Sequence, residues 1–306
     1  MITLGIDTSN YATSVALVDN ENHNVIYSEK IFLPVEEGKT GLRQQQALFE
    51  HIKNLTNIFS SFKGMDIGAV GVSVKPKDED DSYMPCFLAG KMSAYSIAAN
   101  LNVPLIESSH QTGHLTSALY DINNEDLFKR TLLMLHVSGG TTDIMLAVDG
   151  KVVKTLGSSL DLYAGQAVDR LGVRLGYPFP AGQYVSELAE KCGENIAVKV
   201  SVKGFDCNLS GLENQCDKLL TNGYSKEYVC KYCLTYIART LIKMINNVKQ
   251  EYGDMPLVLA GGVMSSTVIK KIVTENIPDA MFVKPQFSSD NAIGVAVNAY
   301  RKVTNG

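Results

Sequence analysis

The feature that most constrains this chain is a strand–polar turn–strand pattern that occurs twice. Leu132–Val137 is an apolar run that meets the turn SGGTT, residues 138–142, and a second apolar run follows. Near the start of the chain, the expected strands Ile2–Asp7 and Ser14–Asp19 flank another polar turn. Glycine lets a ligand approach the main chain, and bare backbone N–H groups bind phosphate. An ordinary hairpin is the alternative for either copy alone, because turns use the same residues.

A strand that ends in two glycines extends the pattern. Pro256–Ala260 is apolar and runs into Gly261-Gly262, and a helix is expected over Val263–Thr274. The order strand, strand, strand, helix, strand, helix, strand begins at both hairpins. We therefore predict an α/β chain built from two copies of one nucleotide-binding unit, in which the hairpins hold phosphates from opposite lobes and the Gly-Gly turn lies against the nucleoside.

The lobes are expected to divide near residue 130. The first covers residues 1–129 and is completed by a C-terminal helix over 291–302, and the second covers 130–290 with a mostly helical insertion over 159–252. The other expected elements are strands at Asn24–Phe32, Ile67–Val74, Val103–Glu107, Val152–Gly157 and Ala280–Lys284, and helices at Leu42–Phe62, Pro85–Leu101, Tyr163–Leu175, Gly182–Lys191, Gly211–Thr221 and Lys226–Tyr252.

Composition limits the classes of function. The chain has 306 residues, and 45% of them are apolar, so a large core is available. A net charge of −4 argues against nucleic-acid binding by charge alone. We find no leader and no apolar run long enough to span a bilayer, and we expect a cytoplasmic protein without a membrane partner. The six cysteines then read as reduced thiols, and Cys230 and Cys233 as core residues.

The pair His110 and His114 is the sharpest local signal. Histidines at i and i+4 lie on one helix face and can bind one metal ion. Gln111 stands where a metalloprotease needs its glutamate base, so protease chemistry is not indicated. A helix cap beside a surface histidine is the alternative reading. As a third ligand we expect Asp290, which lies just before the last helix that a duplicated fold returns to the first lobe.

Two further segments allow two interpretations each, and a third has one simple interpretation. Asp169, in the second turn of an expected helix, can hold a ribose hydroxyl or be a solvated helix charge. The proline-rich turn Tyr177–Gly182 can press the Gly182 backbone against a base or simply connect two helices. The charged stretch Lys75–Tyr83 is most simply a solvated loop.

Seven short motifs occur in a specific order along nearly the whole chain. With them the chain resembles the Kae1/TsaD/Gcp family, within the duplicated actin-like ATPase fold shared by actin, sugar kinases and Hsp70: two lobes with a cleft and a helical insertion in the second. The motifs are Leu4-Gly5-Ile6-Asp7-Thr8-Ser9, His110-x-x-Gly113-His114, Val137-Ser138-Gly139-Gly140-x-Thr142, Ala164-Gly165-x-Ala167-x-Asp169, Ser210-Gly211-Leu212, Ala260-Gly261-Gly262-Val263 and Ser289-Asp290-Asn291-Ala292.

The resemblance implies a reaction and its components. The activity is transfer of a threonylcarbamoyl group from threonylcarbamoyl-AMP to N6 of adenosine 37 in tRNA. One divalent metal ion (Fe, Zn or Mg) is expected on His110, His114 and Asp290. The implied partners are tRNA, a related actin-like dimerisation subunit and a small P-loop ATPase. The expected contacts to ATP, AMP or threonylcarbamoyl-AMP are Ser138, Gly139, Gly140, Asp169, Gly182, Gly261, Gly262 and Ser266.

Departures from the family pattern keep other functions open. Tyr11 and Ala12 replace two acids of the first loop, which leaves Asp7 as its only carboxylate to orient the N6 amine as a catalytic group. The family's His, Glu, Lys and Asn are replaced by Thr141, Gln166, Glu213 and Ser266. A divergent paralogue that is non-catalytic or has a changed substrate is therefore the second hypothesis. A small-molecule kinase is the third, although no convincing general-base aspartate is present.

Overall fold

The computed structural model divides into two compact units, which are described separately. Unit 1 comprises residues 1–125, 150–152 and 289–306, and unit 2 comprises 126–149 and 153–288. The structure describes every residue except 10–11, 35–41, 63, 80, 289–290 and 306. The proposed ligand Asp290 and the replaced loop residue Tyr11 therefore lie outside the described residues.

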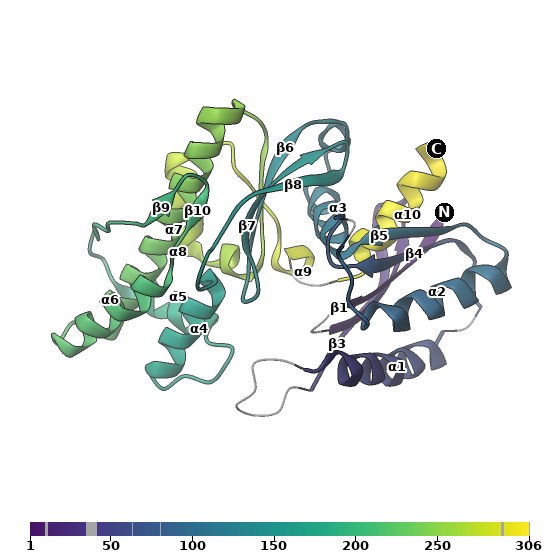
Figure 1. The fold of residues 1–306 in the computed structure, drawn as a ribbon, viewed down its shortest axis with the longest axis horizontal. Helices are drawn as coiled ribbons and strands as arrows, with labels where there is room; N and C mark the ends of the chain where they lie inside the picture. The colour runs from purple at the N-terminus through teal and green to yellow at the C-terminus, as the bar shows by residue number, and fades with distance from the viewer. Residues whose placement is uncertain (10–11, 35–41, 63, 80, 289–290, 306) are drawn as a thin grey trace. The chain divides into compact units, whose positions relative to one another are not determined.

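Unit 1 is a five-stranded mixed sheet with helices packed on it (Figure 1). The strand order is β3-β2-β1-β4-β5, in which β1–β2 and β2–β3 are antiparallel and β1–β4 and β4–β5 are parallel. Helix α10 packs against α3, β1 and β4, and α2 packs against β4. The elements are β1 (Ile2–Ser9), β2 (Ala12–Asp19), β3 (Asn24–Phe32), α1 (Gln44–Ser60), β4 (Ile67–Lys75), α2 (Phe87–Leu101), β5 (Leu105–Ser109), α3 (His110–Ile122) and α10 (Ile293–Asn305).

Unit 2 repeats this topology. Its sheet order read from the other edge is β8-β7-β6-β11-β12, with β6–β7 antiparallel and β6–β11 and β11–β12 parallel. The predicted duplicated α/β fold is confirmed. The elements are η1 (Glu125–Lys129), β6 (Leu132–Val137), β7 (Thr142–Val148), β8 (Lys151–Ser158), α4 (Ala164–Arg174), α5 (Gly182–Lys191), β9 (Val202–Lys203), β10 (Asp206–Cys207), α6 (Ser210–Thr221), α7 (Lys226–Tyr252), β11 (Leu257–Ala260), η2 (Gly262–Ser265), α8 (Thr267–Asn276), β12 (Met281–Phe282) and α9 (Pro285–Ser288).

Strands β1, β2 and β6 have apolar sequences because both faces of each strand are covered by other parts of the fold. β6 is buried at every position, and β1 and β2 are buried at nearly every position. About half of the 27 residues of helix α7 are buried, and Cys230 and Cys233 lie in that core as expected. None of the helices that the structure describes combines the length and apolar character that crossing a bilayer requires.

One predicted helix is broken. The pattern over Val263–Thr274 indicated a single helix, but the structure has the short η2, an extended residue at Ser266, and then α8. The Ser266 backbone adopts φ −64° and ψ 122°, which ends one helical segment and begins the next. The insertion also contains the small β9–β10 hairpin, which the helical pattern had not indicated.

Candidate functional site

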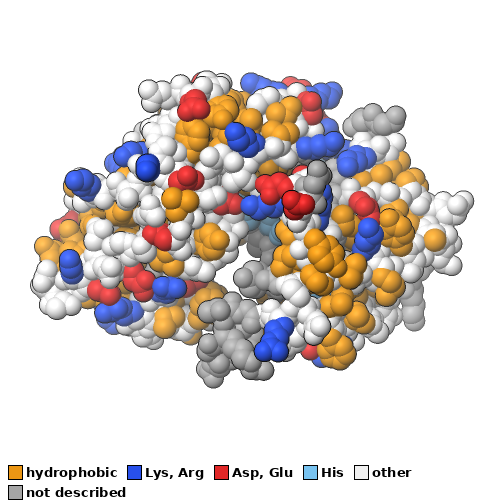
Figure 2. Space-filling view, in the orientation of Figure 1, with side chains coloured by type: hydrophobic (Ala, Val, Ile, Leu, Met, Phe, Trp, Pro, Cys, Tyr) orange, Lys and Arg blue, Asp and Glu red, His pale blue; other side chains and the backbone are white. Residues whose placement is uncertain are grey.

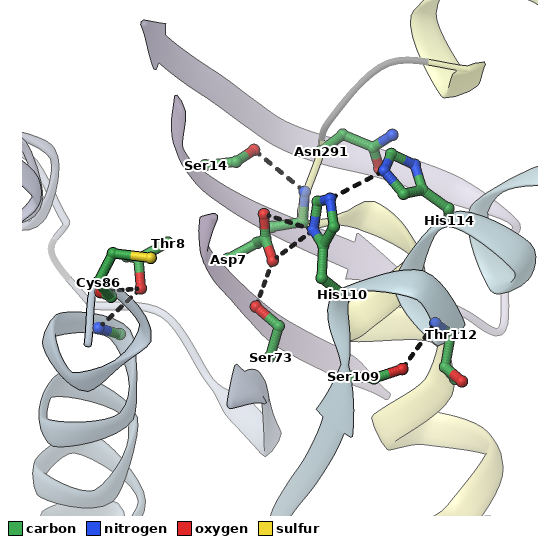
Figure 3. A network of polar contacts seen from close by, with 12 residues as sticks. Asp7, Thr8, Ser14, Ser73, Cys86, Ser109, His110, Thr112, His114 and Asn291 are labelled. Carbon is green, nitrogen blue, oxygen red and sulfur yellow. Dashed lines mark hydrogen bonds and ion pairs between the residues drawn. The ribbon is translucent and has the colours of Figure 1, made fainter. Parts of the chain in front are cut away.

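Helix α3 in unit 1 presents His110 and His114 together. It begins directly after β5, and the Ser109 hydroxyl caps it by accepting a hydrogen bond from the Thr112 N–H at 3.0 Å. The two imidazole rings have centroids 4.4 Å apart, and their Nε2 atoms are 3.0 Å apart (Figure 3). His114 is buried, and His110 is 21% exposed. The i, i+4 spacing therefore brings the two ring nitrogens together, as the sequence predicts.

Asp7 holds the other nitrogen of His110. Its carboxylate at the end of β1 is fully buried and lies 3.0 and 3.2 Å from His110 Nδ1, and it also accepts a hydrogen bond from the Ser73 hydroxyl (Figure 3). A carboxylate only accepts, so Nδ1 carries the proton in this pair and Nε2 presents its lone pair toward His114. Asp7 thus fixes both the ring orientation and the tautomer of His110.

The histidine pair fits a divalent metal ion. Metal–imidazole bonds are about 2.0–2.1 Å long, so Nε2 atoms 3.0 Å apart can both reach one ion. The same separation also suits a direct hydrogen bond between the two rings. Within the described part of the chain, no group of three His, Cys, Asp or Glu side chains is placed to hold a metal. The third ligand expected from the sequence, Asp290, lies outside the described residues.

The chain next to Asp290 is tied to the histidine helix. The Asn291 side-chain oxygen accepts hydrogen bonds from the Ser117 hydroxyl on α3 at 3.1 Å and from the Ile293 N–H at 3.0 Å. The Ala292 N–H donates to the Ser14 hydroxyl at 3.0 Å (Figure 3). Helix α10 then crosses α3 closely, since a Cβ added at Gly294 would lie 1.9 Å from the Gly113 carbonyl oxygen.

The charged stretch 75–83 does more than face solvent. Asp78 Oδ2 accepts hydrogen bonds from the Thr112 hydroxyl at 2.6 Å and the Ser109 hydroxyl at 2.9 Å. The Pro76 carbonyl accepts from the Gln111 N–H at 3.0 Å. A carboxylate at a helix N-terminus is stabilising because it compensates the helix dipole and satisfies free donors. Asp78 is exposed, as expected for a solvated loop, and in addition it braces the first turn of α3.

In unit 2 the turn between β6 and β7 carries Ser138, Gly139 and Gly140. The Ser138 N–H donates to the Thr141 carbonyl at 2.7 Å, and the Gly140 N–H donates to the Ser138 hydroxyl at 3.3 Å. Both glycines are exposed, and a Cβ added at Gly139 would have no atom within 4 Å. The surface of the turn at Gly139 is therefore open to a ligand.

Two other glycines bring neighbouring elements onto this turn. A Cβ added at Gly165 would lie 2.5 Å from the Gly139 backbone nitrogen, and the Gly165 N–H donates to the Ser138 carbonyl at 3.1 Å. Gly261 has φ +103°, and a Cβ there would lie 2.2 Å from the Val137 carbonyl oxygen. Only glycine fits both positions, because each requires direct backbone-to-backbone contact. The N-terminus of α4 and the β11–η2 turn thus both lie against the hairpin.

Asp169, Gly182 and Ser266 are connected through α5. The Asp169 carboxylate accepts hydrogen bonds from the Ala181 N–H at 2.8 Å and from the Gly182 N–H. Burial raises the pKa of Asp169, while these two bonds oppose the rise. The Ser266 hydroxyl lies 3.0 Å from that of Ser186 on α5. Contacts through α4, α5 and η2 therefore link all the expected nucleotide-contacting positions, and every one of them lies in unit 2.

The sequence did not reveal the residues that support the site through hydrogen bonds to partners far away along the chain. Ser73 and Asp78 carry no local signal, because each acts on a residue more than thirty positions away. Asp161 is a third such residue, because its carboxylate acts on residues more than forty positions away. Burial opposes its ionisation, but bonds from Ser210, the Leu209 and Leu162 N–H groups and Asn208 lower its pKa to about 2. Asp161 thereby ties the loop before α4 to the N-terminus of α6.

The topology of both units defines the actin-like ATPase fold, as comparison with solved structures confirms. HypF from T. kodakarensis aligns with a TM-score of 0.62 at 12% identity, covering 99% of this chain and 48% of that chain. Component A of (R)-2-hydroxyglutaryl-CoA dehydratase from Acidaminococcus fermentans aligns with a TM-score of 0.58 at 14% identity, covering 99% of each chain. At these identities the likeness concerns the fold alone.

Sequence comparison places the chain within that fold class. The TsaD family, described as tRNA N6-adenosine threonylcarbamoyltransferase, matches residues 83–297, and the chain belongs to this family. A relative of that name from Methanopyrus kandleri is 23% identical over 301 residues, covering 97% of this chain and 86% of the relative. Another, from Streptococcus equi subsp. equi, is 26% identical over 322 residues, covering 99% and 92%. The resemblance stated from the motifs is confirmed.

Proposed function

We propose that this chain transfers a threonylcarbamoyl group from threonylcarbamoyl-AMP to N6 of adenosine 37 in tRNA. The observation that carries the proposal is the Asp7–His110–His114 arrangement in a member of the TsaD family. The N6 amine is a weak nucleophile, so a catalyst gains most by holding it against the carbonyl and stabilising the charge that develops there.

A divalent metal ion held by His110, His114 and Asp290 is part of this proposal. Such an ion polarises a carbonyl or phosphoryl oxygen. The protein's own contribution is to aim the ring nitrogens: Asp7 fixes His110, and Asp78 braces the helix that carries both rings. We therefore assign Asp7 a positioning role through His110, in place of the direct catalytic role expected from the sequence.

Asp7→Asn is expected to weaken zinc binding by about ten- to hundredfold. The amide keeps the shape of the side chain but removes the negative charge that faces His110 Nδ1. Chelator competition with purified protein measures the affinity, and thermal unfolding verifies the fold. Asp19→Asn, in the neighbouring strand β2, is the matched control and should bind zinc like the wild type. Equal zinc affinity in Asp7→Asn and wild type would contradict the positioning role.

An adenine nucleotide is proposed to bind in unit 2. The turn at Gly139 and Gly140 is exposed, so a phosphate can approach its backbone closely and would replace the Ser138 hydroxyl as the acceptor for the Gly140 N–H. The two linked residues Asp169 and Gly182 are assigned to the nucleoside, as are Gly261, Gly262 and Ser266 on the adjoining β11–η2 segment. The contacts among these elements support one continuous site.

A specific observation keeps a changed-substrate or non-catalytic role as the second candidate. Glu213, at the position of a family lysine, pairs with Arg170 at 3.1 Å across α4 and α6. Ser266, at the position of a family asparagine, is engaged with Ser186. Both side chains therefore contact other residues of unit 2. They do not supply the amine of the family lysine or the amide of the family asparagine.

An exposed apolar face in unit 1 suits a protein partner. Helix α2 exposes Leu88, Met92 and Tyr95 at 45%, 59% and 48%, one turn apart, and α1 beside it exposes Phe49 and Ile52 at 60% and 45%. Figure 2 shows orange side chains gathered over this part of the chain. Apolar stripes with this spacing pack against other helices. We assign the face to a related actin-like subunit; tRNA and a small P-loop ATPase are further proposed partners.

Reconstitution tests the proposed activity. Purified chain, unmodified tRNA, threonylcarbamoyl-AMP and the two partner proteins from the same organism should yield modified adenosine, detected by nucleoside analysis. Turnover should be slow, since losing one well-placed charged group costs on the order of 10²–10³ in rate and Tyr11, Ala12 and Thr141 replace such groups. Product should disappear with His110→Ala. No product alongside intact metal and nucleotide binding would favour the second candidate.

A further inference from the structure

The connection between α4 and α5 carries an exposed aromatic side chain, Phe179. This ring is 76% exposed and lies between Pro178 and Pro180 (the connection between α4 and α5 in Figure 1). A single exposed apolar residue is ordinary in itself. Phe179 is unusual because hydrogen bonds hold both ends of its loop on α4, and one of these bonds is to Asp169.

Both ends of the loop are anchored on α4. On one side, the Tyr177 N–H donates to the Gly172 carbonyl at 3.0 Å. On the other, the Ala181 N–H donates to Asp169 Oδ1 at 2.8 Å, and a Cβ added at Gly172 would lie 2.3 Å from the Ala181 Cβ. The two prolines restrict the backbone on either side of Phe179. The ring is therefore presented by a constrained segment whose C-terminal end is bonded to the proposed nucleoside residue Asp169.

A second aromatic surface flanks the same segment. The rings of Tyr177 and Tyr184 stack with centroids 4.9 Å apart and an interplanar angle of 17°. Tyr184 lies in the first turn of α5, two residues after Gly182, and is 38% exposed. Exposed aromatic rings are surfaces on which bases stack, because every base has an apolar face and stacking tolerates any sequence.

We propose that Phe179 is a stacking residue for a purine base bound at the Asp169–Gly182 end of unit 2. The inference rests on the proposed function, which brings two purines to the protein: the adenine of the nucleotide substrate and the adenosine of tRNA. The flat face of the base is the chemistry that both share. A stacked base contributes about ten- to hundredfold in affinity, as estimated from alanine substitution of stacking residues.

The absence of tryptophan makes the contact directly observable. The chain has no tryptophan, so Phe179→Trp introduces a single indole reporter. AMP, ATP and unmodified tRNA are titrated in separate experiments. The ligand whose base stacks on residue 179 should quench or shift the indole emission. The midpoint of that change should match the dissociation constant from calorimetry. Phe49→Trp, at a phenylalanine of unit 1 that is 60% exposed, is the matched reporter and should not respond.

Affinity measurements separate stacking from mere bulk. Phe179→Leu should weaken binding of the responding ligand by about ten- to hundredfold, Phe179→Tyr should keep it, and neither should lower the melting temperature. Wild-type affinity in Phe179→Leu, or a silent indole in Phe179→Trp protein that binds ligand, would overturn the stacking role alone. Failure of the wild-type chain to bind any of these ligands would overturn the proposed function together with it.

Discussion

Gly139→Val is expected to abolish nucleotide binding and to leave the free energy of unfolding unchanged. A Cβ added at Gly139 would meet no atom within 4 Å, so the new side chain does not disturb the folded turn. It would instead occupy the open side of the turn, where a phosphate must come close to the backbone N–H groups. Calorimetry with ATP and AMP measures the loss, and thermal unfolding verifies the fold.

The contrast with Gly261→Val makes this result specific. A Cβ at Gly261 would lie 2.2 Å from the Val137 carbonyl oxygen, and the residue has φ +103°, which a β-branched residue does not tolerate. Gly261→Val should therefore lose both stability and binding, whereas Gly139→Val loses binding alone. Undiminished heat of ATP binding by Gly139→Val, or none by the wild type, would argue against the phosphate site.

The second large effect is expected at the histidine pair. Wild-type protein should carry about one equivalent of transition metal or zinc, as a site with two imidazoles and a carboxylate does. The double variant His110→Ala/His114→Ala should carry none, because both Nε2 donors are removed. Elemental analysis after dialysis against zinc measures the content. Modified adenosine in the reconstituted assay should be lost together with the metal.

Two further variants sharpen the metal test. His23→Ala removes an exposed histidine that stacks on Tyr120 and does not belong to the pair, and it should retain full metal content. Asp290→Ala tests the third proposed ligand and should weaken binding without lowering the melting temperature. Equal metal content in wild type and the double histidine variant would remove the metal from the proposed mechanism.

Much of the architecture could be predicted because it is encoded locally. Apolar runs around glycine-rich and polar turns indicated both hairpins, and the repeated element order indicated the duplicated sheet that the structure has. The His110–His114 pairing also follows from local geometry, since residues four apart on a helix are neighbours. Local reasoning failed over Val263–Thr274, where the apolar pattern continues through Ser266 but the backbone does not remain helical.

The support of the site was decided by tertiary structure. Asp7 and His110 are separated by 103 residues, and they meet because β1 and α3 pack in one unit. Asp78 reaches the start of α3 across 34 residues. Gly165 and Gly261 looked like two ordinary motif glycines, and only the folded chain shows each backbone pressed on the hairpin.

The sequence by itself therefore determined the turns, the helix face that carries the histidines, and the family. The tertiary structure decided which carboxylate orients His110 and which backbones enclose the hairpin. The physical reason is the range of the forces involved. Backbone conformation and helical periodicity act over a few residues and leave a mark on the sequence. Contacts across a packed core depend on how whole elements fit together, so no short stretch of sequence records them.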